Sequence, residues 1–200
     1  MSLDLKDDAT PVCLRPYPVP RVHEAMFRNE FEILVKLGVL EEANYSECGA
    51  PSFAQPKPKT NLVRFLSDFG NLNSKLKRKP YPLPKIREML LNLVDFKYAM
   101  SLELNMGYYH IRLINQASNL CTIILPWVKY KDKRLPMGIC NSLEIFQEKI
   151  NKIFCGFEFI RAYFDDLLII TKVDWYDHLN KLEQFLKKLN YNDIKCNIER

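Results

Sequence analysis

The sequence is best understood from Arg161-Ala162-Tyr163-Phe164-Asp165-Asp166-Leu167-Leu168-Ile169-Ile170-Thr171, in which two adjacent carboxylates lie between two short apolar runs. Runs of this length, rich in β-branched and aromatic residues, are typical of buried strands. We therefore predict a β-hairpin with the acidic pair at its turn. Two like charges beside an apolar hairpin raise each other's pKa unless a positive group lies against them. A divalent cation such as Mg²⁺ would satisfy both carboxylates. For the pair alone, a solvent-exposed acidic turn without function remains an open alternative.

The composition is that of a globular chain with a modest positive charge. Hydrophobic residues make up 48% of the 200 residues, and the net charge of +5 permits a polyanionic partner. The six cysteines are scattered without a CxxC pair. This pattern disfavours a zinc knuckle or a disulfide framework and favours reduced thiols in the cytoplasm or nucleus. The acidic start MSLDLKDD lacks an apolar core, and no apolar run approaches the roughly 18 residues of a membrane span, so we do not expect a secreted protein.

The first part of the chain predicts an extended segment, a helix and a strand. Residues 1–20 are punctuated by prolines and indicate an extended lead-in. Apolar residues at helical spacing follow from Arg21, with Val22 at the start of the apolar face and Gly38 as the stop signal. Residues 57–69 combine a cationic loop with an apolar strand that carries Arg64. Cations at such a strand edge suit a phosphate group, although a solvated basic hairpin would have the same sequence.

A basic cluster follows this strand. It would supply sequence-independent contacts to a nucleic-acid backbone, and a solvated surface is the alternative. Its members are Lys75, Lys77, Arg78 and Lys79.

The second part of the chain predicts a split βαβ arrangement. A strand over residues 100–104 carries the single acid Glu103 and leads into a glycine turn with exposed aromatic residues. A hairpin-like region over residues 121–134 intervenes before the next helix. From Met100 the remaining elements then follow in the order strand, helix, strand, strand, helix, strand. This order is typical of a ferredoxin-like sheet, in which the strand with Glu103 and the acidic hairpin are neighbours.

Three carboxylates would then converge at one sheet edge. Two divalent ions about 3.5–4 Å apart can align the attacking and leaving oxygens of a phosphoryl displacement, and they need carboxylates from separate strands. Glu103, Asp165 and Asp166 would supply them. Cations for a triphosphate, and aromatic or turn residues for the sugar and base, would come from Lys59, Arg64, Tyr108 and Leu135–Gly138.

Several motifs occur together in a recognisable order. They are Asp68-Phe69 with Leu72-Asn73, Tyr81-Pro82-Leu83-Pro84, Met106-Gly107-Tyr108-Tyr109-His110-Ile111, Leu135-Pro136-Met137-Gly138 with Ile145-Phe146-Gln147, and Tyr163-Phe164-Asp165-Asp166. From about Arg15 to the C-terminus the chain resembles a reverse transcriptase, most closely that of gypsy-type LTR retrotransposons. The resemblance implies an α+β fold with a fingers subdomain over residues 21–83 and 112–134. It also implies a palm subdomain with a ferredoxin-like sheet over residues 84–111 and 135–200.

The same resemblance implies the activity of an RNA-directed DNA polymerase. Its cofactors would be two Mg²⁺ ions, or Mn²⁺ in their place. Its partners would be dNTPs, a primed RNA or DNA template and other parts of a retroelement polyprotein, with no membrane partner. Catalysis and metal binding would fall on Glu103, Asp165 and Asp166. Contacts to the dNTP would come from Lys59, Arg64, Leu104, Tyr108 as a steric gate against a 2′-hydroxyl, and Met137 beneath the templating pair. Contacts to nucleic acid would come from Lys75, Lys77, Arg78, Lys79 and Tyr163.

The sequence departs from the family pattern at several points. Glu103 and Gly70 stand where the family has Asp and Arg, and Asn192-Asp193 replaces a usual glycine. A carboxylate displaced by about an ångström can cost about 10²-fold in rate. The sequence also ends at Arg200 without a thumb or RNase H region, so we expect weak or absent processive synthesis. Two alternatives remain open: a catalytically dead relic that only binds nucleic acid, and a two-metal nuclease, which the motif order disfavours.

Overall fold

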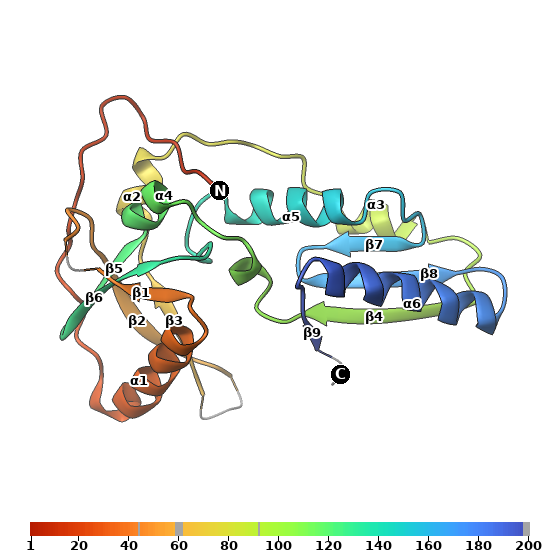
Figure 1. The fold of residues 1–200 in the computed structure, drawn as a ribbon, viewed down its shortest axis with the longest axis horizontal. Coiled ribbons are helices and arrows are strands. Elements are labelled where there is room, and N and C mark those ends of the chain that lie inside the picture. Colours follow the sequence, from red (N-terminus) through yellow and green to blue (C-terminus); the bar gives the residue numbers. More distant parts are fainter. Residues whose placement is uncertain (44, 59–61, 92, 198–200) are drawn as a thin grey trace. The chain divides into compact units, whose positions relative to one another are not determined.

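The structure is a computed structural model, which describes residues 1–43, 45–58, 62–91 and 93–197 (Figure 1). The chain forms two compact units, and each unit combines two separate segments. The first unit comprises residues 1–78 and 111–142, and the second comprises residues 79–110 and 143–200. Each unit is described by itself.

The first unit is built on a five-stranded sheet in the order β1-β6-β5-β2-β3, in which β2 and β5 are parallel and the other neighbours are antiparallel. The hairpin expected over residues 121–134 is confirmed as β5 and β6. The elements of this unit are α1 (Arg21–Lys36), β1 (Leu40–Glu42), β2 (Ala50–Pro56), β3 (Val63–Ser67), α2 (Gly70–Lys75), α4 (Asn115–Leu120), β5 (Thr122–Leu125) and β6 (Val128–Asp132).

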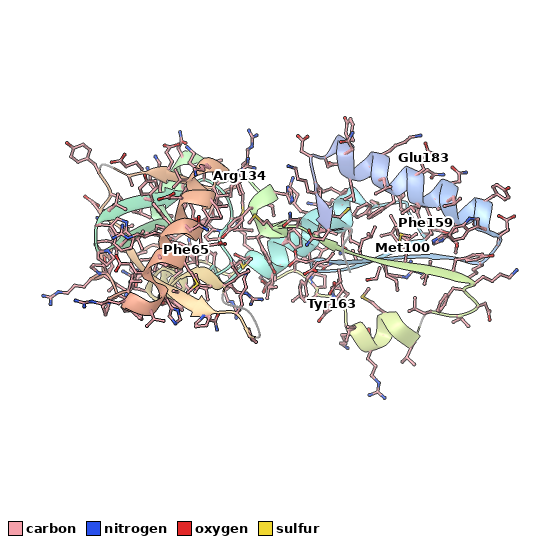
Figure 2. All side chains as sticks on the ribbon, turned by 90° about the horizontal axis from the view of Figure 1, so that it is seen from below. Phe65, Met100, Arg134, Phe159, Tyr163 and Glu183 are labelled. Carbon is pink, nitrogen blue, oxygen red and sulfur yellow. The ribbon has the colours of Figure 1, made fainter. Side chains whose placement is uncertain are left out.

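Helix α1 covers the sheet through an aromatic face. Phe27 is fully buried and stacks on Phe65 of β3 with ring centroids 4.9 Å apart. Phe65 is labelled in Figure 2. The helix ends as predicted before Gly38, whose φ of +65° is readily adopted only by a residue without a side chain. Val22, in contrast, is 81% exposed, so its predicted place on the buried face is wrong. It lies in the first turn, where apolar spacing does not reveal how far the covered face extends.

The N-terminal lead-in is extended and packs on its own unit. Leu5 forms an isolated antiparallel bridge with Leu76, and Cys13 forms a parallel one with Gly49. Leu3 is buried together with Leu76, so this polar segment still contributes apolar side chains to the core of the first unit.

The second unit contains the predicted split βαβ sheet. Its four strands follow the order β7-β8-β4-β9, with every neighbouring pair antiparallel (Figure 1). This is the ferredoxin-like arrangement, since the first and third strands in the chain lie at the centre. The elements are α3 (Ile86–Leu91), β4 (Tyr98–Leu104), the 3₁₀ helix η1 (Gly107–His110), α5 (Ser142–Ile153), β7 (Ile160–Tyr163), β8 (Asp166–Thr171), α6 (Trp175–Tyr191) and β9 (Cys196–Asn197).

The core of the second unit lies on one face of this sheet. Leu167 and Ile169 of β8 are fully buried, and Phe154, just after α5, stacks on Phe185 of α6 with centroids 5.3 Å apart. Figure 2 shows α3 and α6 on opposite sides of the sheet, with Tyr163 toward α3. Over residues 166–169 of β8, accessible and buried residues alternate, which places Asp166 and Leu168 on the face opposite Leu167 and Ile169.

All six cysteines are free thiols. Among the helices within the described ranges, none combines the length and apolarity that crossing a membrane requires.

Candidate active site

The acidic residues meet at one end of the second unit's sheet. Strands β4 and β8 pair so that Glu103 lies directly opposite Asp166, and β7 places Tyr163 opposite Asp166 on the other side. Directly opposite residues of antiparallel strands project from the same face. The backbone N–H of Leu104 donates to the carbonyl of Asp165 at 2.7 Å, which ties the turn to the end of β4. The prediction that Glu103 and the acidic hairpin are neighbours is confirmed.

The hairpin turn depends on a buried side chain from α5. Phe164 adopts a φ of +52°, which is costly for a bulky residue, and its backbone N–H donates to Oε1 of Gln147 at 2.8 Å. Nε2 of Gln147 donates to the carbonyl of Ala162 at 3.0 Å, so one amide spans both sides of the turn. Gln147 is fully buried. The sequence analysis assigned it no role. A glutamine on an otherwise apolar helix face nevertheless indicates a buried amide that needs hydrogen-bond partners.

Asp165 has an unusual electrostatic environment. Its Oδ1 atom is buried and has no hydrogen-bond partner among the residues that the structure describes. Burial, followed by the nearby charges of Asp166 and Glu103, raises the pKa of Asp165 to about 6. A carboxyl group that is both desolvated and repelled by its neighbours is stabilised in its ionised form by a cation.

The oxygen atoms of these three carboxylates suit a divalent cation, but the side chains are not gathered around a single metal position. Glu103 of β4, Asp166 of β8 and Asp165 in the turn before β8 supply the hard oxygen ligands that Mg²⁺ prefers, and the unsatisfied Oδ1 of Asp165 is one of them. Over the described ranges, however, no three histidine, cysteine, aspartate or glutamate side chains are gathered closely enough to hold an ion. The backbone therefore places the acids together, while their side chains do not share one centre.

Gly107 makes room for the carboxylate of Asp165. A Cβ atom at this position would overlap Oδ1 of Asp165 and would lie 2.7 Å from Cζ of Phe146. Real Cβ atoms do not approach other atoms so closely, so a larger residue here would displace the Asp165 carboxylate and the Phe146 ring. The sequence analysis saw this glycine only as part of a turn, and the close approach comes from elements that are distant in the chain.

Tyr108 is buried, whereas the sequence suggested exposed aromatic residues after β4. The ring is 8% exposed and lies against Phe146 of α5, with centroids 4.8 Å apart. The expectation was wrong because η1 turns the residues after Gly107 back toward α5. Burial, followed by the negative charges of Asp165 and Glu144, raises the pKa of Tyr108 to about 12, so its phenol is neutral at physiological pH.

The other residues predicted to contact a dNTP have different surroundings. Leu104 is buried at the end of β4, opposite Cys196. Arg64 is an exposed residue of β3, and Met137 is 51% exposed in a turn; both belong to the first unit. Lys59 lies outside the described residues.

Asn73 holds the turn that carries Met137. Its Nδ2 donates to the carbonyl of Gly138 at 2.8 Å, and its Oδ1 accepts from the backbone N–H of Cys140 at 2.8 Å. Both bonds lie on the C-terminal side of Met137, so this side-chain amide limits the conformations open to the segment that follows Met137. Asn73 was quoted in the motifs without a role, because only the fold brings it to this turn.

The basic cluster is partly occupied by the N-terminal lead-in. Nζ of Lys77 lies 2.7 Å from Oδ1 of Asp7, and Nζ of Lys75 donates to the carbonyl of Thr10 at 2.7 Å. Arg78 is exposed. Nucleic-acid binding by this cluster and by Tyr163 stays a prediction.

Gly70 and Asp193, two of the positions at which the sequence departs from the family pattern, have well-defined backbone conformations or contacts. The backbone N–H of Gly70 donates to Oδ1 of Asp68 at 2.9 Å as α2 begins. Asp193 adopts a φ of +54° after α6, the left-handed conformation that glycine commonly takes there and that Asp tolerates better than most residues.

An apolar cavity of about 320 Å³ adjoins the acidic hairpin on the α3 face. Ile86, Met89 and Leu93 line one wall, while Tyr163 and Asp166 line another. Asp166 is itself exposed, so its carboxylate lies at the solvated edge of this apolar surface.

Comparisons with known proteins agree with this arrangement. The family described as "Reverse transcriptase (RNA-dependent DNA polymerase)" matches residues 55–199. The chain is 29% identical over 201 residues to the Retrovirus-related Pol polyprotein from transposon gypsy of Drosophila melanogaster, covering 96% of this chain and 19% of that protein. It is 28% identical over 178 residues to the Putative enzymatic polyprotein of Cassava vein mosaic virus, covering 86% of this chain and 27% of that protein.

A solved structure shows the same fold. It is the foamy viral protease-reverse transcriptase dRH in complex with double-stranded DNA, with a TM-score of 0.85 and 22% identity, covering 96% of this chain and 35% of that one. The fold is therefore the mixed α/β fingers–palm fold of reverse transcriptases. The chain spans about a fifth to a quarter of the two polyproteins, at 19% and 27% of their lengths. Because the two are almost equally similar, the comparison establishes the family and not one branch of it.

Proposed function

The chain belongs to the reverse transcriptase family, and on that premise we propose that it is the fingers–palm part of an RNA-directed DNA polymerase that adds dNTPs to a primer 3′-hydroxyl. The observation that supports this most strongly is the register that sets Glu103 opposite Asp166, with Asp165 in the adjoining turn. The proposed fingers comprise residues 21–83 and 112–134 and the proposed palm residues 84–111 and 135–200, ranges that overlap largely with the first and the second unit.

The acidic residues would hold divalent metal in this reaction. Glu103 and Asp165 are the proposed principal ligands and Asp166 the more peripheral one. When bound, two Mg²⁺ ions, or Mn²⁺ in their place, would supply positive charge to the attacking and leaving oxygens. The chain's own contribution is to keep Asp165 in a partly desolvated place, where an unpaired carboxylate is unfavourable and a cation is strongly attracted.

The remaining roles follow from the family likeness. Lys59 and Arg64 would contact the triphosphate, Leu104 and Met137 would border the nucleotide, and Tyr108 would exclude a 2′-hydroxyl. The packing of the Tyr108 ring against Phe146 supports a steric role, since a residue that excludes a 2′-hydroxyl has to be held in place by its neighbours. Tyr108→Ala should therefore raise ribonucleotide incorporation relative to dNTP incorporation about tenfold or more, while an unchanged ratio would remove the gate role.

The decisive test of the polymerase function is primer extension with Mg²⁺ and with Mn²⁺. Glu103→Asp restores the residue usual in the family and should raise the rate by about 10–10²-fold, because the longer side chain displaces the carboxylate. Asp165→Asn should abolish incorporation, and Ser101→Ala, an exposed position of β4, is the matched control. Robust activity of the native chain with no gain from Glu103→Asp would show that Glu103 is a competent ligand and not a defect.

A catalytically inactive nucleic-acid-binding relic is the second candidate. It is supported by the lack, within the described ranges, of side chains already gathered for a metal ion. It predicts binding of duplexes with a steep salt dependence and no incorporation in either metal. Filter binding at several salt concentrations beside the primer-extension assay separates the two candidates.

We also propose that the chain derives from a gypsy-type LTR retrotransposon and works beside other parts of a polyprotein, in the cytoplasm or nucleus. The ordered motifs and the 29% identity to the gypsy polyprotein support this origin. Sequencing the DNA that flanks the gene tests it, since long terminal repeats are expected on both sides and their absence would favour a pararetroviral source.

A further inference from the structure

A series of side-chain hydrogen bonds runs from Tyr81 to the acidic hairpin. Nδ2 of Asn151 donates to the hydroxyl of Tyr81 at 3.1 Å, and Oδ1 of Asn151 accepts from Nε2 of Gln147 at 2.9 Å. Gln147 in turn bonds the carbonyl of Ala162 and the N–H of Phe164 across the turn. All five residues belong to the second unit.

The hydrogen-bond roles along this series orient both amides. Nε2 of Gln147 faces two acceptors, on Asn151 and Ala162, which leaves Oε1 for the N–H of Phe164. A half-turn of that amide would place an oxygen against two acceptors and an NH₂ group against a donor, which leaves buried groups unsatisfied. The orientation of Asn151 is fixed in the same way, because its NH₂ group donates to Tyr81 only while its oxygen faces Gln147.

The geometry points to Asn151 and Tyr81 as positioning residues for the acidic hairpin, which we propose act by holding the amide of Gln147 in the orientation that fixes the Tyr163–Asp166 turn. Phe164 stands in the left-handed region at a φ of +52°, and the bond from its N–H to Gln147 offsets that strain. Asp165 follows directly. A turn released from Gln147 would therefore move the carboxylate that the proposed function requires. The catalytic relevance of this inference rests on that proposed function, whereas its structural part does not.

We call the series of hydrogen bonds from Tyr81 through Asn151 to Gln147 the relay. It is tested by hydrogen exchange at the Phe164 amide in the ¹⁵N-labelled full chain. In Asn151→Ala, exchange should become about tenfold faster, because Gln147 loses one of its two acceptors. Asn151→Asp keeps an acceptor for Gln147 and can accept from Tyr81, so it should restore protection to near the native value. Tyr81→Phe should speed exchange about two- to threefold, and combining it with Asn151→Ala should add nothing, since both act through one relay.

The chain offers a matched control on α6. Asn180 accepts from Gln184 at 3.4 Å in the same four-residue spacing that joins Gln147 and Asn151. Among the residues that the structure describes, neither Asn180 nor Gln184 is hydrogen-bonded to the Tyr163–Asp166 turn. Asn180→Ala should leave Phe164 exchange unchanged. A global loss of stability would instead speed exchange throughout the second unit, and the buried amides of Leu167 and Ile169 report such a loss.

The functional readout is the Mg²⁺ concentration that gives half-maximal primer extension. Asn151→Ala should raise it about fivefold and lower kcat while leaving the dNTP KM unchanged, a split that general destabilisation does not produce. If the native chain extends no primer, the polymerase proposal fails and the Phe164 exchange alone decides the relay. Unchanged Phe164 exchange in Asn151→Ala overturns the relay, whatever the activity.

Discussion

Each unit contains an aspartate that is shielded from solvent, and the two differ in how deeply they are buried and in what surrounds them. Asp132, at the end of β6 in the first unit, is 5% exposed, and burial alone raises the pKa of its carboxyl well above the usual value. Asp165, in the second unit, is less deeply buried, but Asp166 and Glu103 add to the effect of burial. An aspartate that is only buried, like Asp132, could be replaced by asparagine without loss of a charge interaction. Burial together with neighbouring acids held on paired strands marks a place for a cation.

The largest expected effect comes from filling the space beside Asp165. Gly107→Ala would place a methyl group on the carboxylate and on Phe146, so we expect at least about a 10²-fold loss of nucleotide incorporation. Gly70→Ala is the control in the first unit, where an added Cβ meets only Oδ1 of Asp68 at 3.0 Å, and it should change the rate less than about threefold. Single-turnover primer extension measures both. Native activity in Gly107→Ala would show that the carboxylate need not occupy this position.

The acid of the first unit should affect stability without responding to metal. Because the folded-state pKa of Asp132 is raised, its contribution is most favourable below pH 3.8 and is lost as the pH rises above that value. Asp132→Asn should therefore raise the free energy of unfolding at pH 7 relative to the native chain, because the amide carries no charge to desolvate. Urea unfolding between pH 4 and pH 8 measures this difference. A gain that depends on Mg²⁺ would contradict the distinction between the two acids.

The acid of the second unit should show a smaller effect that metal reverses. Its pKa rises from 3.8 to about 6, so the metal-free chain should lose stability as the pH rises through this interval. After allowance for solvent screening of this half-buried group, the loss is about 1 kcal/mol, and Asp165→Asn should remove it. Addition of Mg²⁺ at pH 7 should stabilise the native chain and leave Asp165→Asn unchanged. Equal responses of the two proteins would mean that Asp165 is not a ligand.

The smallest effect concerns Lys77, a member of the basic cluster that belongs to the first unit. The exposed ion pair between Asp7 and Lys77 contributes little to stability, so Asp7→Asn should leave the free energy of unfolding within about 0.5 kcal/mol. Freed from Asp7, Lys77 should strengthen duplex binding about two- to threefold and steepen its salt dependence by up to about one unit. The exposed Asp8 gives the matched variant Asp8→Asn, which should do neither. Identical salt slopes for both variants would remove Lys77 from the proposed nucleic-acid contacts.

Much of the second unit could be predicted because its signals are local and periodic. The acidic pair between two apolar runs predicted the hairpin, and the order of elements predicted the ferredoxin-like sheet that pairs β4 with β8. Tyr108 was misjudged for the opposite reason. Its burial depends on η1 turning toward α5, and Phe146 is far from it in the chain. Gln147 and Asn73 likewise gain their roles only through contacts with turns distant in the sequence.

The sequence by itself determined which chemical groups the chain carries and which strands bring the acids together, since alternating apolarity sets strand faces and register. Only the tertiary structure decided how those groups are held. It seats the carboxylate of Asp165 against Gly107, buries it beside like charges and ties the turn to Gln147. The physical reason is that desolvation and hydrogen-bond satisfaction depend on every element packed around a group, and no local pattern encodes those neighbours.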